Sequence, residues 1–275
     1  MLADIAEHLI CPVCSGGLEI GERVMRCAQG HSYDIAKQGY VSLLIGSQPP
    51  GTADSPAMVA ARSDFLAAGH YAPLARALGD CLPRDSHVIV DAGTGTGYYL
   101  AAVLETAPQA MGLAFDVSKH AVKRAARAHA RIGAFVADVW QPLPIADGAA
   151  DVILDVFAPR NGPEFARVLR PGGALVVVTP ARSHLSPLVH QLGLLSVDGD
   201  KETRVSQSLR GFVEVDRRTV EFEMELTREG VAEVVGMGPS AWHTEPAQLA
   251  ARIAKFQEKT WTQAAFHLST FQHAS

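Results

Sequence analysis

Short apolar runs alternate with amphipathic segments through the middle of the chain. The runs are rich in Val, Ile and Ala, as buried strands are, and they lie at 88–92, 110–115, 133–136, 150–157 and 174–179. Between them, apolar residues recur at helical spacing and predict helices ending near Thr106, covering 119–131 and covering 163–169. Strands that alternate with helices in this way predict an α/β fold built on a parallel sheet.

The flanking segments predict further elements. A helix is expected at 57–66, and a second one ends near Cys81. After the core, residues 217–226 alternate between apolar and polar side chains, which predicts a strand with one wet face. The remaining elements are helices at 229–235 and 245–256 and a final strand at 260–271.

The turn after the first core strand is the main candidate for ligand binding. The strand ends in Asp91, and Gly93, Gly95 and Gly97 follow at alternate positions before an apolar helix begins. Glycines let a ligand lie directly on the main chain and on the helix N-terminus, which predicts a nucleotide-type pocket. Glycine-rich turns also occur for packing reasons alone. Asp116, at the end of the second strand, is placed to bind both ribose hydroxyls of an adenosine.

Cysteine usage adds a small module at the N-terminus. Cys11, Cys14, Cys27 and His31 follow the pattern C-x2-C-x12-C-x3-H. Two close pairs of thiol and imidazole ligands are what tetrahedral zinc requires, and four protein ligands make the metal structural. We therefore predict a zinc-binding module at 1–45, a linker at 46–56 that is rich in turn formers, and a main domain at 57–275.

Charge and hydropathy narrow the class of protein. The chain has 275 residues and a net charge of −5, which argues against nucleic-acid binding through bulk electrostatics. Basic residues recur along 119–131, and this helix face is either solvated or a local basic surface. No apolar run approaches the length of a membrane span, and the N-terminus lacks the plan of a signal peptide, so we expect a soluble cytoplasmic protein without a membrane partner.

Three local patterns choose between cofactors. The glycines follow G-x-G-x-G rather than G-x-G-x-x-G, an A-D-x-x-x-L-P turn follows the third strand, and L-R-P-G-G precedes the fifth. Together they resemble the class I, Rossmann-like methyltransferases, whose sheet has seven strands and whose cofactor is S-adenosyl-L-methionine. The resemblance implies that the glycine turn receives the methionine end of the cofactor, that Asp116 binds the ribose, and that Asp138 and Val139 flank the adenine.

The whole chain also resembles a narrower family. The zinc module, Tyr98-Tyr99 and the segments 68–71, 157–159, 179–185 and 237–243 are similar to the bacterial 23S rRNA guanine-N1-methyltransferases that modify the hairpin loop of helix 35, most of all to the tylosin-resistance branch. The resemblance implies macrolide resistance and 23S rRNA as partner, and it leaves a homodimer open. Together with the turn, it gives these cofactor-binding residues: Tyr71, Asp91, Gly93, Gly95, Gly97, Tyr98, Tyr99, Asp116, Asp138, Val139 and His184. Many members have Gly-Cys-Gly-Glu-Gly where this chain has Gly-Thr-Gly-Thr-Gly, which keeps the backbone requirement.

Two residues are candidates for the acceptor site, which binds the group that receives the methyl. Asp155 and Asn161 lie at the carboxyl end of the fourth strand, the edge from which acceptor-binding residues come. Asp155 is our hypothesis for the base that takes the N1 proton. An acid there equally caps the following turn. His184 is expected to orient the cofactor or substrate, unless it is structural.

Side chains that could bind RNA occur at both ends of the chain. The candidates are Tyr33, Lys37, Tyr40, Trp242 and His243. For the two tyrosines, packing beneath the zinc site is the alternative. Two other functions stay open: methylation of a small molecule, and RNA binding without catalysis.

Overall fold

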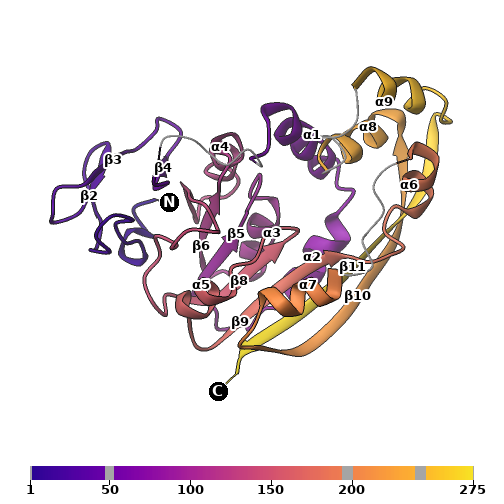
Figure 1. The fold of residues 1–275 in the computed structure, drawn as a ribbon. Coiled ribbons are helices and arrows are strands. Elements are labelled where there is room, and N and C mark those ends of the chain that lie inside the picture. The colour runs from indigo at the N-terminus through magenta and orange to yellow at the C-terminus, as the bar shows by residue number, and fades with distance from the viewer. Residues whose placement is uncertain (1, 47–52, 194–200, 239–245, 275) are drawn as a thin grey trace.

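The computed structural model describes residues 2–46, 53–193, 201–238 and 246–274. Its centre is a mixed sheet of eight strands in the order β10-β11-β9-β8-β5-β6-β7-β4 (Figure 1). The bounds of these strands are β4 Tyr40–Ser42, β5 Val88–Ala92, β6 Met111–Asp116, β7 Ile132–Val136, β8 Ala150–Val156, β9 Leu169–Pro180, β10 Phe212–Thr227 and β11 Lys259–His273. The strands from β4 to β9 run parallel, and β11 pairs antiparallel with both β9 and β10.

Alternation along the strands divides the core between the two faces of the sheet. On β5, Ile89 packs into one cluster, whereas Val88 and Val90 pack into the other. The first cluster is covered mainly by α1 (Pro56–Ala67), α2 (Ala72–Asp80), α3 (Tyr98–Thr106), α4 (Lys119–Ala125), α6 (Ser186–Leu192), α8 (Arg228–Gly236) and α9 (Pro246–Ile253). The second is covered by the N-terminal module, α5 (Gly162–Val168) and α7 (Lys201–Ser208).

The N-terminal module is a small antiparallel sheet followed by a strand that joins the main sheet. It contains η1 (Ala6–His8) and the antiparallel strands β1 (Glu19–Ile20), β2 (Val24–Arg26) and β3 (Ser32–Asp34). Its last strand, β4, pairs in parallel with β7, with Val41 opposite Phe135. The sheet therefore has eight strands where seven were predicted, because the module supplies an extra edge strand.

Most predicted elements lie where the sequence places them, and the differences are local. The basic helix α4 is shorter than the predicted 119–131, because turns begin at Ala126 and the backbone N–H of Arg131 donates to His129 Nδ1 at 3.0 Å. Strand β9 begins at Leu169 rather than 174, with an irregularity in its register against β8. Two short helices, α6 and α7, were not predicted. Of the predicted linker 46–56, residues 47–52 lie outside the described part of the chain.

None of the helices that the structure describes combines the length and the apolar character that crossing a bilayer requires.

Candidate active site and zinc centre

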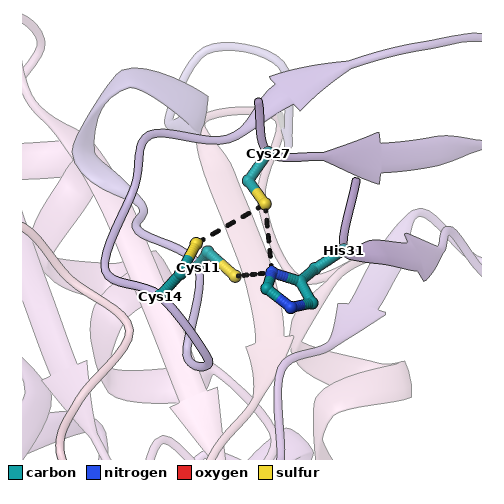
Figure 2. A group of neighbouring side chains, drawn as sticks. All are labelled: Cys11, Cys14, Cys27 and His31. Atoms are coloured by element: carbon teal, nitrogen blue, oxygen red, sulfur yellow. Dashed lines mark hydrogen bonds between the residues drawn. The ribbon is translucent and has the colours of Figure 1, made fainter. Parts of the chain in front are cut away.

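The four predicted zinc ligands converge in the N-terminal module (Figure 2). His31 Nδ1 lies 3.5 Å from Cys11 Sγ and 3.3 Å from Cys27 Sγ, and the Sγ atoms of Cys14 and Cys27 are 3.6 Å apart. All four ligand atoms lie within 4.8 Å of one another. A tetrahedral zinc ion with bonds of about 2.3 Å to sulfur separates its ligand atoms by about 3.8 Å. The donor set and its spacing therefore fit zinc.

The thiol of Cys11 has a lowered pKa, which favours metal binding. Burial raises its pKa, but the Tyr33 hydroxyl, 3.0 Å from Sγ, and backbone N–H groups outweigh this and lower the pKa of Cys11 to about 6. A thiolate at neutral pH is the form that binds zinc. Tyr33 thus contacts a zinc ligand, as the packing alternative predicted.

The glycine turn joins β5 to α3, and carboxylates at the ends of β5 and β6 accept hydrogen bonds from it. The backbone N–H groups of Gly95 and Ser118 donate to the carboxylate of Asp116 at 2.9 and 2.8 Å. The Thr94 hydroxyl donates to Asp91 Oδ2 at 2.6 Å. The structure thus brings the two predicted acids, Asp91 and Asp116, to the same turn, at the carboxyl ends of adjacent strands.

The Asp91 carboxyl group is fully buried, and this gives it an unusual titration. Burial raises the pKa of Asp91 to about 7; the hydrogen bond from Thr94 lowers it and the nearby charge of Asp116 raises it. The unfolded chain has an ordinary aspartate pKa of about 3.9. Between these two values the folded protein binds more protons than the unfolded one, so stability falls as pH rises from about 4 to about 7.

We therefore expect the wild type to lose stability on this pH rise relative to Asp91→Asn. Between pH 5 and pH 8 the loss is roughly 3 kcal/mol, because each of the two pH units from 5 to the folded pKa of about 7 contributes about 1.4 kcal/mol. Thermal unfolding midpoints of both proteins at pH 5 and pH 8, without cofactor, measure the difference. Parallel pH profiles for the two proteins would contradict the assignment.

Arg62 of α1 lies over the glycine turn, where its guanidinium would be 3.4 Å from a β-carbon added to Gly95. The Arg62 guanidinium binds the Asp54 carboxylate and donates to the carbonyl of Met237 at 2.9 Å. The Ser118 hydroxyl donates to the Asp54 carbonyl at 2.9 Å. Burial raises the pKa of Asp116; among the nearby charges, Asp54 raises it and Arg62 lowers it. Asp54 and Arg62 were not predicted as site residues, because no local pattern links them to a turn some thirty residues away.

Tyr71, at the start of α2, contacts His184, in the loop before α6. Tyr71 Oη lies 3.2 Å from His184 Nε2, and the backbone N–H of Ala265 donates to His184 Nδ1 at 3.2 Å. Because Nδ1 accepts this hydrogen bond, neutral His184 carries its proton on Nε2, and the Nε2–H donates a hydrogen bond to the Tyr71 hydroxyl. The bond from a backbone N–H is what the structural alternative predicted, and the orienting role of His184 stays a prediction. Tyr71 is deeply enclosed, with 2% of its surface exposed.

Asn161, at the start of α5, holds the segment that carries the predicted adenine-flanking residues, Asp138 and Val139. Asp138 Oδ1 accepts from the backbone N–H of Trp140 at 3.0 Å. Asn161 Nδ2 donates to the Val139 carbonyl at 2.8 Å, and its side-chain oxygen caps α5 by accepting from Glu164. Asn161 therefore supports the loop that carries Asp138 and Val139.

Asp155 lies inside the sheet rather than on the acceptor surface. Its side chain is fully buried; this raises its pKa well above the usual range, while the charge of Arg160 lowers it and that of Asp91 raises it. Arg160 Nε is 3.1 Å from Asp155 Oδ1, but the N–H is not aimed at the oxygen, so the pair is an ion pair without a hydrogen bond. The base role of Asp155 stays a hypothesis, and this burial counts against it.

Comparison with known proteins places both parts of the chain. A family model described as the RlmA N-terminal zinc ribbon matches residues 9–46, and a methyltransferase-domain model matches 89–173. A putative 23S rRNA (guanine-N(1)-)-methyltransferase of Micromonospora griseorubida is 50% identical over 99% of both chains. The 23S rRNA (guanine(748)-N(1))-methyltransferase of Streptomyces fradiae is 47% identical over 93% of both. The chain belongs to the 23S rRNA (guanine-N1)-methyltransferase family.

Membership of this family agrees with the observed fold. A SAM-dependent methyltransferase from Aquifex aeolicus superposes with a TM-score of 0.50 at 14% identity, covering 79% of this chain and 98% of the other. The YcgJ protein of Bacillus subtilis gives the same score, covering 75% of this chain and 100% of the other. The family assignment and the geometry together make this a methyltransferase that uses S-adenosylmethionine and carries a structural zinc.

Proposed function

We propose that the protein methylates N1 of a guanine in the helix 35 hairpin loop of 23S rRNA. The observation that carries this proposal is that relatives named for this reaction match the zinc ribbon and the methyltransferase domain as one continuous chain. A small-molecule methyltransferase would leave the ribbon without a purpose. By analogy with the Streptomyces fradiae relative, guanine 748 is our proposed target.

The chemistry asks for alignment more than for activation of the donor. S-adenosylmethionine supplies a methyl group on an electrophilic sulfonium. The lone pair of guanine N1 forms the new N–C bond, the S–C bond electrons stay on sulfur, and the N1 proton leaves, so the products are 1-methylguanine, S-adenosylhomocysteine and a proton. The chain contributes the glycine turn and Asp116 for the donor and the loop after β8 for the acceptor.

Zinc-loaded protein incubated with labelled S-adenosylmethionine and, in separate reactions, an rRNA fragment or a metabolite extract tests the proposal. Primer extension locates the product, because a methyl group on N1 blocks base pairing and arrests reverse transcriptase. Label in the RNA with an arrest in the loop supports the function. Label that enters only a metabolite extract would overturn it.

The biological role follows from the same proposal. Methylation in the cytoplasm would protect ribosomes from tylosin-type macrolides, and expression in a susceptible host measures that protection. Sedimentation of the purified protein decides whether it is a homodimer.

A cationic groove beside α4 is a further part of the proposed RNA interface. The groove has a volume of about 750 Å³ between α1, α3 and α4, and Lys123, Arg124 and Arg127 line it together with two histidines. Its one acidic lining residue, Glu105, is 3.1 Å from His129. This local excess of positive charge favours the RNA-binding alternative for the basic helix face over mere solvation.

Replacing Lys123 or Arg127 with glutamine is expected to weaken binding of the rRNA fragment. Each lost phosphate contact lowers the slope of log affinity against log salt by about 0.7 to 0.9. Filter binding at several salt concentrations measures the slope, and S-adenosylmethionine affinity should not change. Arg84→Gln, an exposed charge in the loop before β5, is the matched control. Slopes equal to that of the control would remove the groove from the interface.

Among the other predicted RNA contacts, the structure describes Lys37 and Tyr40. Lys37 is exposed on the ribbon, whereas Tyr40 packs against the core from β4. Trp242 and His243 lie outside the described residues. The ribbon as a docking module for RNA stays a prediction.

A further inference from the structure

Phe157 has a backbone conformation that its residue type disfavours. It follows the last residue of β8, and its φ is +59°. Among the described residues, the other non-glycine residues with positive φ are Ser15 and Leu185. A β-carbon in the left-handed region meets the neighbouring carbonyl, and a phenylalanine lacks the short polar side chain that offsets this in Asn or Asp. Strain of this kind persists only where the surroundings impose it.

Contacts on both sides impose this conformation. The backbone N–H of Phe157 donates to the Val178 carbonyl at 3.2 Å. The Asp155–Arg160 ion pair and the hydrogen bond from the Asn161 side chain to the Val139 carbonyl fix the rest of the loop after β8. The anchors give the buried Asp155 and the capping Asn161 a positioning role.

The same loop lies directly on the glycine turn. A β-carbon added to Gly93 would lie 2.6 Å from the β-carbon of Ala158, so the turn and the loop are packed against each other at this point. Phe157 therefore stands beside the turn that receives the methionine end of the cofactor, the end that carries the methyl group.

The strained backbone presents an aromatic ring to the surface. The ring centroid of Phe157 is 6.2 Å from that of Tyr99, at 75°, and 5.4 Å from that of Phe266, at 45°. Tyr99 and Phe266 are buried, whereas 42% of Phe157 is exposed. Here the buried rings support it from beneath and leave its outer side free.

We propose that Phe157 is the platform on which the target guanine stacks during methyl transfer. The proposal rests on the proposed function. A base lying flat on the ring keeps its edge free, and once N1 has lost its proton its lone pair lies in the plane of the base, where the methyl group must approach. Single-stranded bases splayed from a loop are commonly held by stacking on aromatic side chains. Stacking also explains why a strained phenylalanine stands where glycine would fit the backbone without strain.

Three substitutions at this position separate stacking from packing. Phe157→Tyr keeps the ring, Phe157→Leu keeps apolar bulk without a ring, and Phe157→Gly removes the ring and the backbone strain. We expect Phe157→Tyr to stay within about threefold of wild-type kcat/KM on the rRNA fragment. Phe157→Leu and Phe157→Gly should fall about 10- to 100-fold, the range that stacking of one base supports.

Two further readouts distinguish this role from a structural one. S-adenosylmethionine affinity should stay within about twofold in all three variants, and Phe157→Gly should unfold at or above the wild-type temperature. With 2-aminopurine in place of the target guanine, fluorescence should be quenched on binding to wild type and Phe157→Tyr but not to Phe157→Leu. Val213→Ala, which trims an exposed apolar residue at the far end of β10, is the control and should behave as wild type.

The outcomes bear separately on the two proposals. A wild-type protein that does not methylate the rRNA fragment overturns the proposed function. An active wild type with Phe157→Leu equal to it in kcat/KM and quenching overturns the stacking role alone.

Discussion

Gly97→Ala is expected to abolish measurable S-adenosylmethionine binding and to lower the free energy of unfolding by about 2–5 kcal/mol. Gly97 precedes α3 with a φ of +79°, and an added β-carbon would lie 2.9 Å from Ala125 Cα and 3.1 Å from two alanine side-chain carbons of the neighbouring segment. The left-handed conformation costs about 1–2 kcal/mol for alanine, and overpacking costs a further 1–3 kcal/mol or so. Because backbone atoms are involved, the turn itself must shift.

Gly172→Ala is the matched control for this substitution. Gly172 has nearly the same φ, +77°, but an added β-carbon has nothing within 4 Å. It should lose only the conformational part, about 1–2 kcal/mol, and bind the cofactor normally. Calorimetric titration and thermal unfolding of both variants measure the two effects. Equal losses in the two variants would show that the contact with α4 is unimportant.

Cys27→Ser should destabilise the whole chain and not the ribbon alone. The ribbon residues Leu9, Met25 and Val41 belong to the same buried cluster as Phe115 and Phe135 of the central sheet. Zinc binding contributes about 10 kcal/mol or more in small zinc modules, which is comparable to the net stability of a typical domain. We therefore expect one unfolding transition at a markedly lower temperature, together with loss of rRNA methylation.

The control for the zinc ligand is Cys81→Ser, because Cys81 lies after α2 and away from the cluster of four ligands. It should retain one zinc per chain and near-wild-type stability. Zinc content by atomic absorption and unfolding followed by circular dichroism measure both. Two separate transitions in Cys27→Ser, one unchanged from wild type, would show that the ribbon folds independently.

The sequence predicted what depends on short-range pattern. The period of apolar residues located the core strands, the spacing of Cys11, Cys14, Cys27 and His31 gave a cluster that converges as expected, and Asp91 and Asp116 meet at the glycine turn. These features are encoded within a few residues or by fixed ligand chemistry.

What the sequence did not predict depends on contacts between distant segments. Nothing in residues 40–42 indicates that they pair with β7, since so short a strand carries no period. Arg62 reaches the glycine turn only because α1 folds over it. The burial of Asp155 and the positive φ of Phe157 follow from how the loop after β8 is anchored, which local residue type does not reveal.

The pairing of β4 with β7 also protects the protein from self-association. Without β4, the outermost parallel strand would expose a row of unpaired backbone groups above the Phe115–Phe135 stack, and such an edge is a template for aggregation. Strand β4 follows the fourth metal ligand by only nine residues. We therefore expect metal supply during synthesis to affect solubility, with inclusion bodies in cultures short of zinc.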